Sequence, residues 1–306
     1  PGFRAGLLPG DVLLEIDGKS AEKMSLRDAV DKLRGEAGTA VKLAVGREGS
    51  PDPLKFEVER EVIKVPSVRG ARVLPGDGPR VGYVRVTQFS EPTGKEFARA
   101  LDGLEKEGID ALVIDLRFNP GGLLSGAVEV AGEFLPGGAL VAYTEGRSAS
   151  AQRRYLAPGK GRKVRAYPVA VLVNGSSASG AEIVAGALKD SGRALLVGET
   201  TFGKGSVQSV VSLPDGSALR MTTAKYFTPG EQPIHEKGVA PHVVATMTAG
   251  EEARLLAARR QEDLPAGTKR EEMEPVDDVP LQRAVDALRG TLLQAREGAA
   301  ESPGGS

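Results

Sequence analysis

A serine and a lysine in this chain have the surroundings that nucleophilic catalysis requires. Ser179 lies in "NGSSASGAEI", between an apolar run and a segment with helical spacing. At a helix start, free N–H groups and the positive end of the helix dipole favour an anion, such as the oxyanion that forms when a serine attacks a carbonyl. A simpler interpretation is that Ser176, Ser177 or Ser179 only caps the helix. The choice depends on the presence of a base, because a serine nucleophile needs one.

Lys204 is the stronger candidate for that base. Histidine is the usual partner of serine, but the only histidines, His235 and His242, lie in "PIHEKGVAPHVV", which has no carboxylate motif to orient an imidazole. Ser–Lys pairs are a known variant of the triad. A free lysine titrates near pH 10.4, so a lysine base needs surroundings that favour the neutral amine by about 4 kcal/mol. Burial beside Phe202 and Val207 could supply them.

Two further groups could complete such a site. Gln208 is two steps of strand alternation from Lys204, so the two side chains would face the same way and the amide oxygen could orient the amine. The glycines of "NPGG" (Asn119–Gly122) follow an apolar run and would let backbone N–H groups approach an oxyanion. Taken alone, these glycines fit an ordinary tight turn better.

The stretch that holds the lysine, "VGETTFGKGS" (Val197–Ser206), is close to the phosphate-binding pattern G-x-x-x-x-G-K-[ST]. Gly205 occupies the position of the Ser or Thr that would hold Mg²⁺. The following "SVQSVVSL" is rich in β-branched residues, which favours a strand where a P-loop needs a helix. We therefore expect no nucleotide site. On local sequence alone, a Gly-rich hairpin with a solvated lysine stays open as the alternative.

The composition excludes several classes of function. The 306 residues contain 40 Lys and Arg against 41 Asp and Glu, a net charge of −1, so no broad basic field would attract nucleic acid or anionic lipid. The absence of cysteine excludes disulfides, thiol nucleophiles and cysteine metal sites. No apolar run reaches the roughly 18 residues of a membrane-spanning helix, and no signal segment is visible.

The catalytic candidates fall in a region where strands and helices alternate. Three apolar runs are typical of strands buried on both faces, and the segments after the first two have helical spacing. The runs are "ALVIDL" (Ala111–Leu116), "VAVLVN" (Val169–Asn174) and "ALLVG" (Ala194–Gly198). This alternation predicts an α/β core.

The regions on either side of this core have other patterns. Near the N-terminus, Ser25 with Asp28 fits a capping box, and the runs "TAVKLAV" (Thr39–Val45) and "KFEVER" (Lys55–Arg60) fit two paired strands. Towards the C-terminus the sequence is charged and has helical spacing. The final "SPGGS" is expected to be disordered.

Three motifs occur together and in order, namely "DLRFNPGG", "VLVNGSSASGAEIVAGALKDSGRALLVGE" and "TFGKGSVQ". They resemble the patterns D-L-R-x-N-x-G-G, S-A-S-x-x-E and G-x-x-T-x-G-K-G-x-x-Q of the carboxy-terminal processing, or tail-specific, protease family. "AGLLPGDVLLEIDGKS" resembles the later part of the PDZ domain that such proteases carry before the catalytic core. "YFTPGEQPIHEKGVAPHVV" resembles the stretch after their catalytic lysine, so the resemblance covers about residues 1–246.

The resemblance implies a role for each matching position. Ser179 matches the nucleophile, Lys204 the general base and Gln208 the orienting third member. The oxyanion hole of backbone N–H groups falls on Gly180 with Gly121 or Gly122. Three positions depart from the family, since Gly180 stands where Ala is frequent, Ala181 where Ser is frequent and His242 where Asp is usual. No metal ion, nucleotide or other cofactor is implied.

The fold class expected is α/β, or α+β over the whole chain. It comprises a mixed-sheet Ser–Lys protease core, an N-terminal partial PDZ domain of small β-rich α+β type, and a C-terminal helical tail. The expected boundaries are 1–64 for the partial PDZ domain, whose N-terminal part is missing, 65–248 for the protease core, and 249–306 for the helical tail with its disordered end.

The function implied is that of a serine endopeptidase that forms an acyl-enzyme with protein substrates recognised by their C-terminal tails. The resemblance implies partners with apolar C-termini, no nucleic acid, and a periplasmic or otherwise exported location with membrane anchoring before processing. It leaves a homo-oligomer open. The alternatives are an inactive PDZ-containing peptide-binding module, against which the presence of Ser179, Lys204 and Gln208 argues, and a Ser–Lys esterase or amidase of small acyl substrates.

Overall fold

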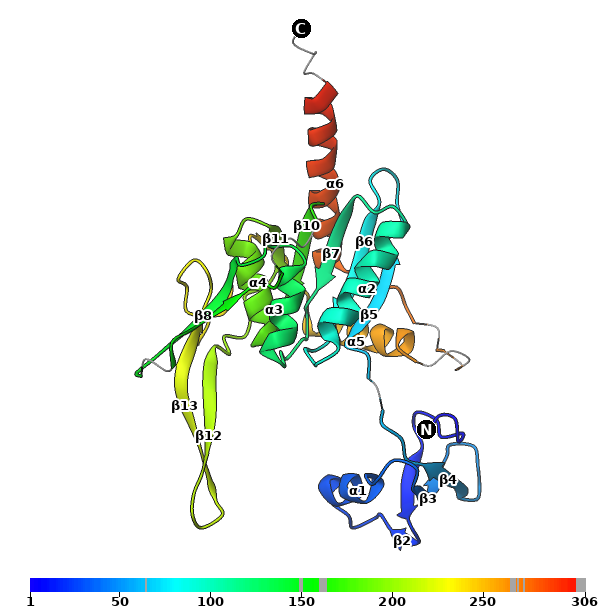
Figure 1. Ribbon diagram of the computed structural model, residues 1–306. Helices are drawn as coiled ribbons and strands as arrows, with labels where there is room; N and C mark the ends of the chain where they lie inside the picture. Colours follow the sequence, from blue (N-terminus) through cyan, green and yellow to red (C-terminus); the bar gives the residue numbers. More distant parts are fainter. Residues whose placement is uncertain are drawn as a thin grey trace. The chain divides into compact units, whose positions relative to one another are not determined.

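Two units, Pro1–Val65 and Pro66–Ser306, each have a hydrophobic core of their own. Figure 1 shows the computed structural model, which describes residues 1–63, 65–148, 151–159, 164–264, 268, 270–271 and 273–300. The predicted boundary between a protease core and a helical tail at residue 248 stays a prediction.

The first unit is an antiparallel sheet with one short helix. The strands, in the order β2-β1-β3-β4, are β1 (Val12–Ile16), β2 (Lys19–Ser20), β3 (Ala40–Gly46) and β4 (Leu54–Glu59). The predicted pairing of residues 39–45 with 55–60 is confirmed by the ladder between β3 and β4. The capping box is also confirmed: helix α1 (Leu26–Leu33) begins at Ser25, whose hydroxyl accepts from the Asp28 N–H at 3.2 Å.

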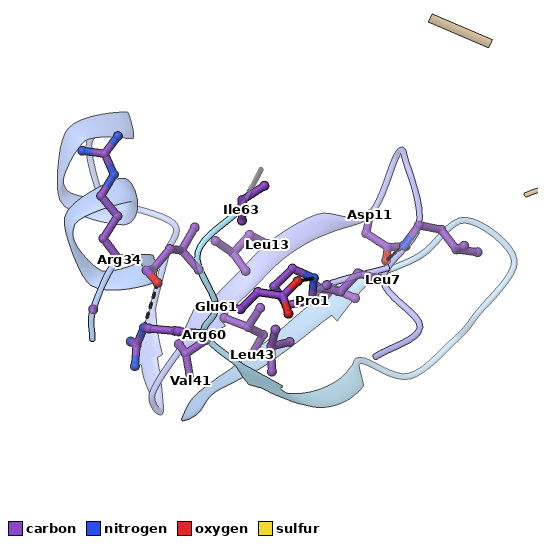
Figure 2. Close-up of a pocket in the computed structure, with 16 residues that line it drawn as sticks. Pro1, Leu7, Asp11, Leu13, Arg34, Val41, Leu43, Arg60, Glu61 and Ile63 are labelled. Carbon is purple, nitrogen blue, oxygen red and sulfur yellow. Dashed lines mark hydrogen bonds and ion pairs between the residues drawn. The ribbon is translucent and has the colours of Figure 1, made fainter. Parts of the chain in front are cut away.

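A cavity of about 650 Å³ opens beside the sheet of the first unit (Figure 2). Its wall is mostly apolar and includes Leu13, Val41 and Leu43 from β1 and β3. Arg60 also lines it, and the Nε of this arginine donates to the carbonyl of Leu33 at 2.9 Å, which satisfies a free carbonyl at the end of α1.

The second unit is built on a six-stranded sheet with the order β14-β11-β10-β7-β6-β5, in which β5 alone is antiparallel to its neighbour. The strands are β5 (Val68–Val73), β6 (Val81–Val86), β7 (Ala111–Asp115), β10 (Val169–Val173), β11 (Ala194–Gly198) and β14 (Val243–Val244). The three strands predicted to be buried are β7, β10 and β11, all inside the sheet. The expected α/β class is therefore confirmed.

Helices cover both faces of this sheet (Figure 1). One face carries α2 (Thr93–Lys106), α3 (Leu124–Gly132) and α4 (Gly180–Asp190), which share one buried cluster. The other face carries α6 (Val279–Ala300), from which Ala284 and Leu288 pack among the strand residues.

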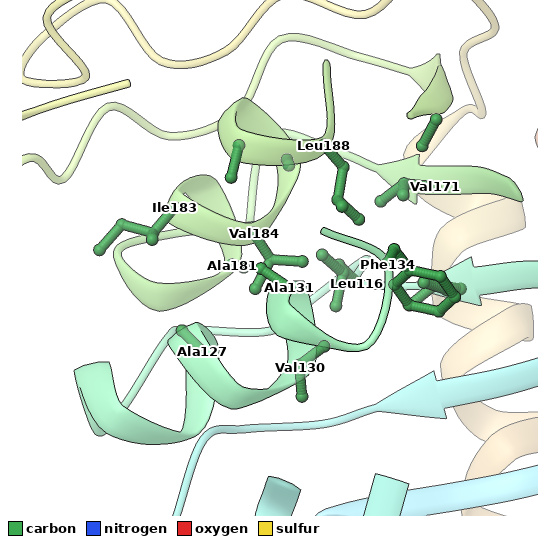
Figure 3. Packing of buried hydrophobic residues seen from close by; sticks show 14 of the residues in the cluster. Leu116, Ala127, Val130, Ala131, Phe134, Val171, Ala181, Ile183, Val184 and Leu188 are labelled. Carbon is green, nitrogen blue, oxygen red and sulfur yellow. The ribbon is translucent and has the colours of Figure 1, made fainter. Parts of the chain in front are cut away.

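Small side chains allow α3 and α4 to pack closely, as Figure 3 shows for Ala127, Ala131 and Ala181. A Cβ added to Gly180, at the start of α4, would lie 3.5 Å from the Cβ of Ala127. Because α3 follows the loop after β7 and α4 follows the turn after β10, this packing brings the two segments together at the carboxyl ends of neighbouring strands. Crevices at such ends are where open α/β sheets bind ligands.

A second sheet of the same unit has the order β12-β13-β8-β9 and was not foreseen as a separate sheet from the sequence. Its strands are β8 (Leu140–Gly146), β9 (Arg153–Leu156), β12 (Ser206–Ser212) and β13 (Ala218–Phe227). Strands β12 and β13 form the long hairpin that projects in Figure 1. This hairpin begins directly after the lysine loop, so the second sheet anchors that loop.

The C-terminal region contributes α5 (Ala249–Glu262) as well as α6. Helix α5 begins with a capping box, in which the Thr248 N–H donates to the Glu251 carboxylate at 2.7 Å. The predicted disordered end, residues 302–306, lies outside the described residues. Of the helices that the structure describes, none is long and apolar enough to span a membrane.

Candidate active site

Ser179 stands at a sharp turn between β10 and α4, directly before the helix as predicted. Its backbone has φ 55° and ψ −111°, a conformation that residues with a side chain rarely adopt. The turn is held by Ser177, whose hydroxyl donates to the Leu116 carbonyl at 2.8 Å and accepts from the Asn174 N–H at 3.0 Å. Backbone strain of this kind costs about 1–3 kcal/mol and clusters at functional sites, which favours a functional role for Ser179.

The "NPGG" loop lies directly against Ser179. Asn119 is buried, and its side-chain amide donates to the Val86 carbonyl at 2.8 Å while its Oδ1 accepts from the Gly121 N–H at 2.8 Å. The Asn119 carbonyl accepts from the Ala178 N–H at 2.9 Å, which ties the loop to the serine turn. A Cβ added to Gly121 would lie 2.6 Å from the Cβ of Ser179, so glycine is needed for this contact.

Two backbone N–H groups beside Ser179 are available to a ligand. Within the described part of the chain, the N–H groups of Gly122 and Gly180 have no hydrogen-bond acceptor, whereas that of Gly121 is bound by Asn119. Gly180 is the first residue of α4, where an N–H group has no partner inside the helix. A pair of free N–H groups on either side of a nucleophile can stabilise an oxyanion.

Lys204 lies in the loop between β11 and β12, which is fixed at several points. The Phe202 N–H donates to the Ser177 carbonyl at 3.0 Å and so joins this lysine loop to the serine turn. The Gly203 carbonyl accepts from the Glu236 N–H at 2.9 Å. Lys204 itself is exposed, as is Phe202, so the expected burial of the lysine beside Phe202 and Val207 was wrong. No other described residue forms a hydrogen bond or ion pair with the amine of Lys204.

The deciding likeness comes from the family comparison, since the model described as Peptidase family S41 matches residues 80–245, more than half of the chain. This chain belongs to peptidase family S41. Residues 1–47 match a PDZ domain. Both matches agree with the resemblance found in the motifs, and they confirm the expected protease family and a PDZ-like first unit. The family is that of serine-type peptidases, as predicted.

Curated relatives of this S41 peptidase carry names that refer to carboxy-terminal processing. The Carboxy-terminal-processing protease of Bartonella bacilliformis is 37% identical, over 96% of this chain and 70% of that protein. The Carboxyl-terminal-processing protease of Synechocystis is 42% identical over 80% of this chain and 56% of that protein. The Carboxy-terminal processing protease CtpA of Bacillus subtilis is 38% identical over 81% of this chain and 51% of that protein. The chain thus spans between half and 70% of the length of these relatives.

The chain also resembles solved structures. A photosystem II D1 C-terminal processing protease is 36% identical with a TM-score of 0.52, over 80% of this chain and 66% of that one. A structure described as an S41 protease from Bacteroides fragilis has a TM-score of 0.57 at 19% identity, over 95% of this chain and 76% of that one. This likeness shows the fold alone.

Glu182 is the residue of this S41 site that the sequence reasoning did not assign. Its buried carboxylate accepts four hydrogen bonds from two segments, the serine turn and the lysine loop. One oxygen accepts from the N–H groups of Ser179 at 2.7 Å and Lys204 at 2.9 Å, and the other from the Gly203 N–H and the Thr201 hydroxyl, both at 2.6 Å. The available signal was the position of Glu182, three residues after the serine at a helix start, as in a capping box. A single carboxylate therefore joins the serine turn to the lysine loop.

The structure limits the reasoning that led to Gln208. Strand β12 begins only at Ser206, so Lys204 lies in the loop before the strand. The bulge beside Val207 and Gln208 has its extra residue on the partner strand β13, between Thr222 and Ala224, and does not interrupt β12 itself. Strand alternation therefore covers Gln208 but does not extend to Lys204, and the expectation that both side chains face the same way stays a prediction. Gln208 is exposed, and its orienting role stays a prediction.

His242 occupies a structural position in the core. The Nδ1 of His242 accepts from the Leu196 N–H at 3.0 Å, and the His242 N–H donates to the Leu196 carbonyl at 2.9 Å. Burial, together with the neighbouring charge of Lys189, lowers the pKa of His242. His242 therefore closes the edge of β11, and its imidazole nitrogen is not available as a base for serine.

Gly205 provides a test of the lysine loop. An added Cβ there would overlap the backbone nitrogen of His235. The Gly205 carbonyl also accepts from the Tyr226 N–H at 2.7 Å, which fixes the loop at this point. We expect Gly205→Ala to displace Lys204 and to lower kcat at least tenfold, since small displacements of catalytic groups are costly. Gly103→Ala, on α2 with open space around it, is the control and should leave kcat unchanged. Equal kcat values for both variants would contradict the tight packing of the loop.

Proposed function

We propose that this S41 peptidase cleaves polypeptides through an acyl-enzyme on Ser179, with Lys204 as the general base. The observation that carries the proposal is the shared carboxylate of Glu182, which binds the N–H groups of both residues. Holding a nucleophile and its base on one rigid acceptor lowers the entropic cost of bringing them together.

In the proposed reaction, the neutral amine of Lys204 takes the proton from the Ser179 hydroxyl as Ser179 Oγ attacks the peptide carbonyl. The ammonium then gives a proton to the leaving amine, and the C–N bond breaks to leave the acyl-enzyme. Water, activated by the same amine, releases the acyl group and restores the serine. Gln208 is proposed to orient the amine.

We propose that the oxyanion is held by the N–H groups of Gly122 and Gly180, the two without an acceptor. Gly121 has a different task in this proposal. Its N–H group is bound to Asn119, and its lack of a side chain allows the loop to reach Ser179. The sequence left open whether Gly121 or Gly122 donates to the oxyanion, and we propose Gly122.

Replacing Ser179 with alanine tests the proposed nucleophile. We expect Ser179→Ala to reduce hydrolysis of an unfolded protein by at least about 10³-fold, because the acyl-enzyme cannot form. The control is Ser176→Ala, three residues earlier and exposed, which should retain full turnover. A Ser179→Ala protein that cleaves as fast as the unsubstituted one would overturn the assignment. Hydrolysis of a small ester but of no peptide would instead favour the esterase alternative.

We further propose that the substrates are recognised by apolar C-terminal residues. The apolar cavity of the PDZ-like unit, with Leu13, Val41 and Leu43 in its wall, supports this specificity (Figure 2). The printed names of the relatives refer to carboxy-terminal processing, which also supports it. A periplasmic or otherwise exported location and homo-oligomer formation rest on the family resemblance.

A further inference from the structure

Helix α5 is attached to the rear of both active-site segments, although it follows them far along the chain. Near its start, the Glu252 carboxylate accepts from the side-chain amide of Asn174 at 2.9 Å. The Oδ1 of Asn174 in turn accepts from the Phe118 N–H at 3.0 Å. Phe118 opens the "NPGG" loop and Asn174 opens the serine turn. A chain of hydrogen bonds thus connects α5 with both.

The far end of α5 is attached to the same loop through a buried ion cluster. Arg259 binds the carboxylate of Asp115, the last residue of β7, which is fully buried and also accepts from Tyr83 at 2.8 Å. Arg117 donates to both oxygens of Asp115, from Nε to Oδ1 at 3.0 Å and from Nη2 to Oδ2 at 2.7 Å. The Arg259 guanidinium also lies over the Phe118 ring, 5.6 Å from its centroid.

The ion cluster continues into the segment before α6. Arg117, which is buried, donates to both oxygens of Asp278 at 2.7 and 2.8 Å. Burial alone raises the pKa of the Asp115 carboxyl, but the guanidinium groups of Arg117 and Arg259 hold it well below its usual range. The carboxylates and guanidinium groups of the cluster are therefore charged and paired. Buried charges that are paired in this way hold the segments that carry them in one arrangement.

We propose that Glu252 and Arg259 of α5 are positioning residues for the oxyanion hole. The loop after β7 carries the Gly122 N–H, and the turn after β10 carries the Gly180 N–H. The distance between these donors depends on Phe118 and Asn174, the two residues that α5 holds. This inference rests on the proposed function. It adds that Glu252 and Arg259, which lie outside the three catalytic motifs, influence kcat.

The test compares three variants of the full chain. Glu252→Ala removes the acceptor for Asn174, Glu252→Gln keeps one, and Asp263→Asn is the control. Asp263 follows α5 and pairs with Arg85 at 2.7 Å, on strand β6 rather than on either loop. Each variant is assayed for peptide hydrolysis, for inhibition by a peptide boronic acid, which forms a tetrahedral adduct with serine, and for its Tm.

We expect Glu252→Ala to lower kcat about tenfold and to weaken boronic acid inhibition by a similar factor, with KM within about twofold. Glu252→Gln should restore both values to within about twofold, and Asp263→Asn should change neither. If Glu252→Ala and Asp263→Asn lose kcat equally, and the loss follows the decrease in Tm, α5 only stabilises the fold. That result would overturn the inference.

Hydrogen–deuterium exchange separates this inference from the proposed function, because it needs no turnover. We expect the segment 116–123 to exchange at least about threefold faster in Glu252→Ala than in Asp263→Asn, since only the first variant loses the attachment of Asn174. Unchanged exchange of this segment in Glu252→Ala would refute the positioning role even in an active enzyme. If the unsubstituted protein hydrolyses no peptide while the exchange difference is observed, the proposed function fails and the positioning of the loop stands.

Discussion

Replacing Lys204 with arginine is expected to lower kcat/KM for peptide hydrolysis by about 10³-fold or more, with the fold intact. Arginine keeps the positive charge and much of the length, but it does not give up its proton near neutral pH. General base catalysis contributes about 10²–10⁴-fold, so its loss dominates the effect. The lysine is exposed and no other described residue binds its amine, so the substitution should shift Tm little.

The measurement is the pH profile of kcat/KM for both proteins. With lysine as the base, the rate of the unsubstituted enzyme rises with pH as the amine loses its proton, whereas the residual rate of Lys204→Arg lacks this rise. Lys106→Arg, at the exposed end of α2, is the matched control and should follow the unsubstituted profile. An arginine variant that keeps more than about a tenth of the rate would remove the lysine from the mechanism.

Replacing Glu182 with glutamine is expected to cost both activity and stability. The carboxylate accepts four hydrogen bonds and is completely buried. A glutamine presents one NH₂ group to donors that then have no acceptor, which costs about 1–3 kcal/mol for each group left unpaired. We expect the free energy of unfolding of the second unit to fall by about 3 kcal/mol. The rate should fall at least tenfold as Ser179 and Lys204 move apart.

Glu251→Gln is the matched control for this substitution. Glu251 holds the same place in the capping box of α5, where it accepts from the Thr248 N–H and hydroxyl near the surface. We expect it to lose about 1 kcal/mol or less of unfolding free energy and no activity. Urea unfolding measured by circular dichroism, together with peptide hydrolysis, distinguishes the two. A Glu182→Gln protein as stable and active as Glu251→Gln would show that the shared carboxylate is not needed.

The elements that hold the site follow local rules and could therefore be predicted. Strands β7, β10 and β11 are continuous apolar runs, and the glycine and serine clusters after them break the runs where loops begin. Ser179 was placed before a helix because the helical spacing starts directly after it. These assignments need only the neighbours in sequence.

The contacts that assemble the site depend on residues far apart in sequence, and here prediction from sequence stopped. Glu182 reaches Lys204 across a strand and a loop, and Arg259 reaches Asp115 across most of the second unit. Gln208 marks the limit of a local rule, because strand alternation begins at Ser206 and does not extend to Lys204. The second sheet was missed because its register depends on long-range pairing of β8 with β13.

The ion cluster behind the site also sets an order of events during synthesis. Asp115 is made 144 residues before Arg259, and Arg117 is made 161 residues before Asp278. At about 5–20 residues per second, the ribosome needs roughly 7 to 30 s to add the missing partners. In our proposal, the serine, the lysine and the oxyanion glycines are all present once Lys204 has been made, 55 residues before Arg259, but their support is not yet present. By this proposal, the oxyanion hole of a nascent chain is held in position only after α5 has been made.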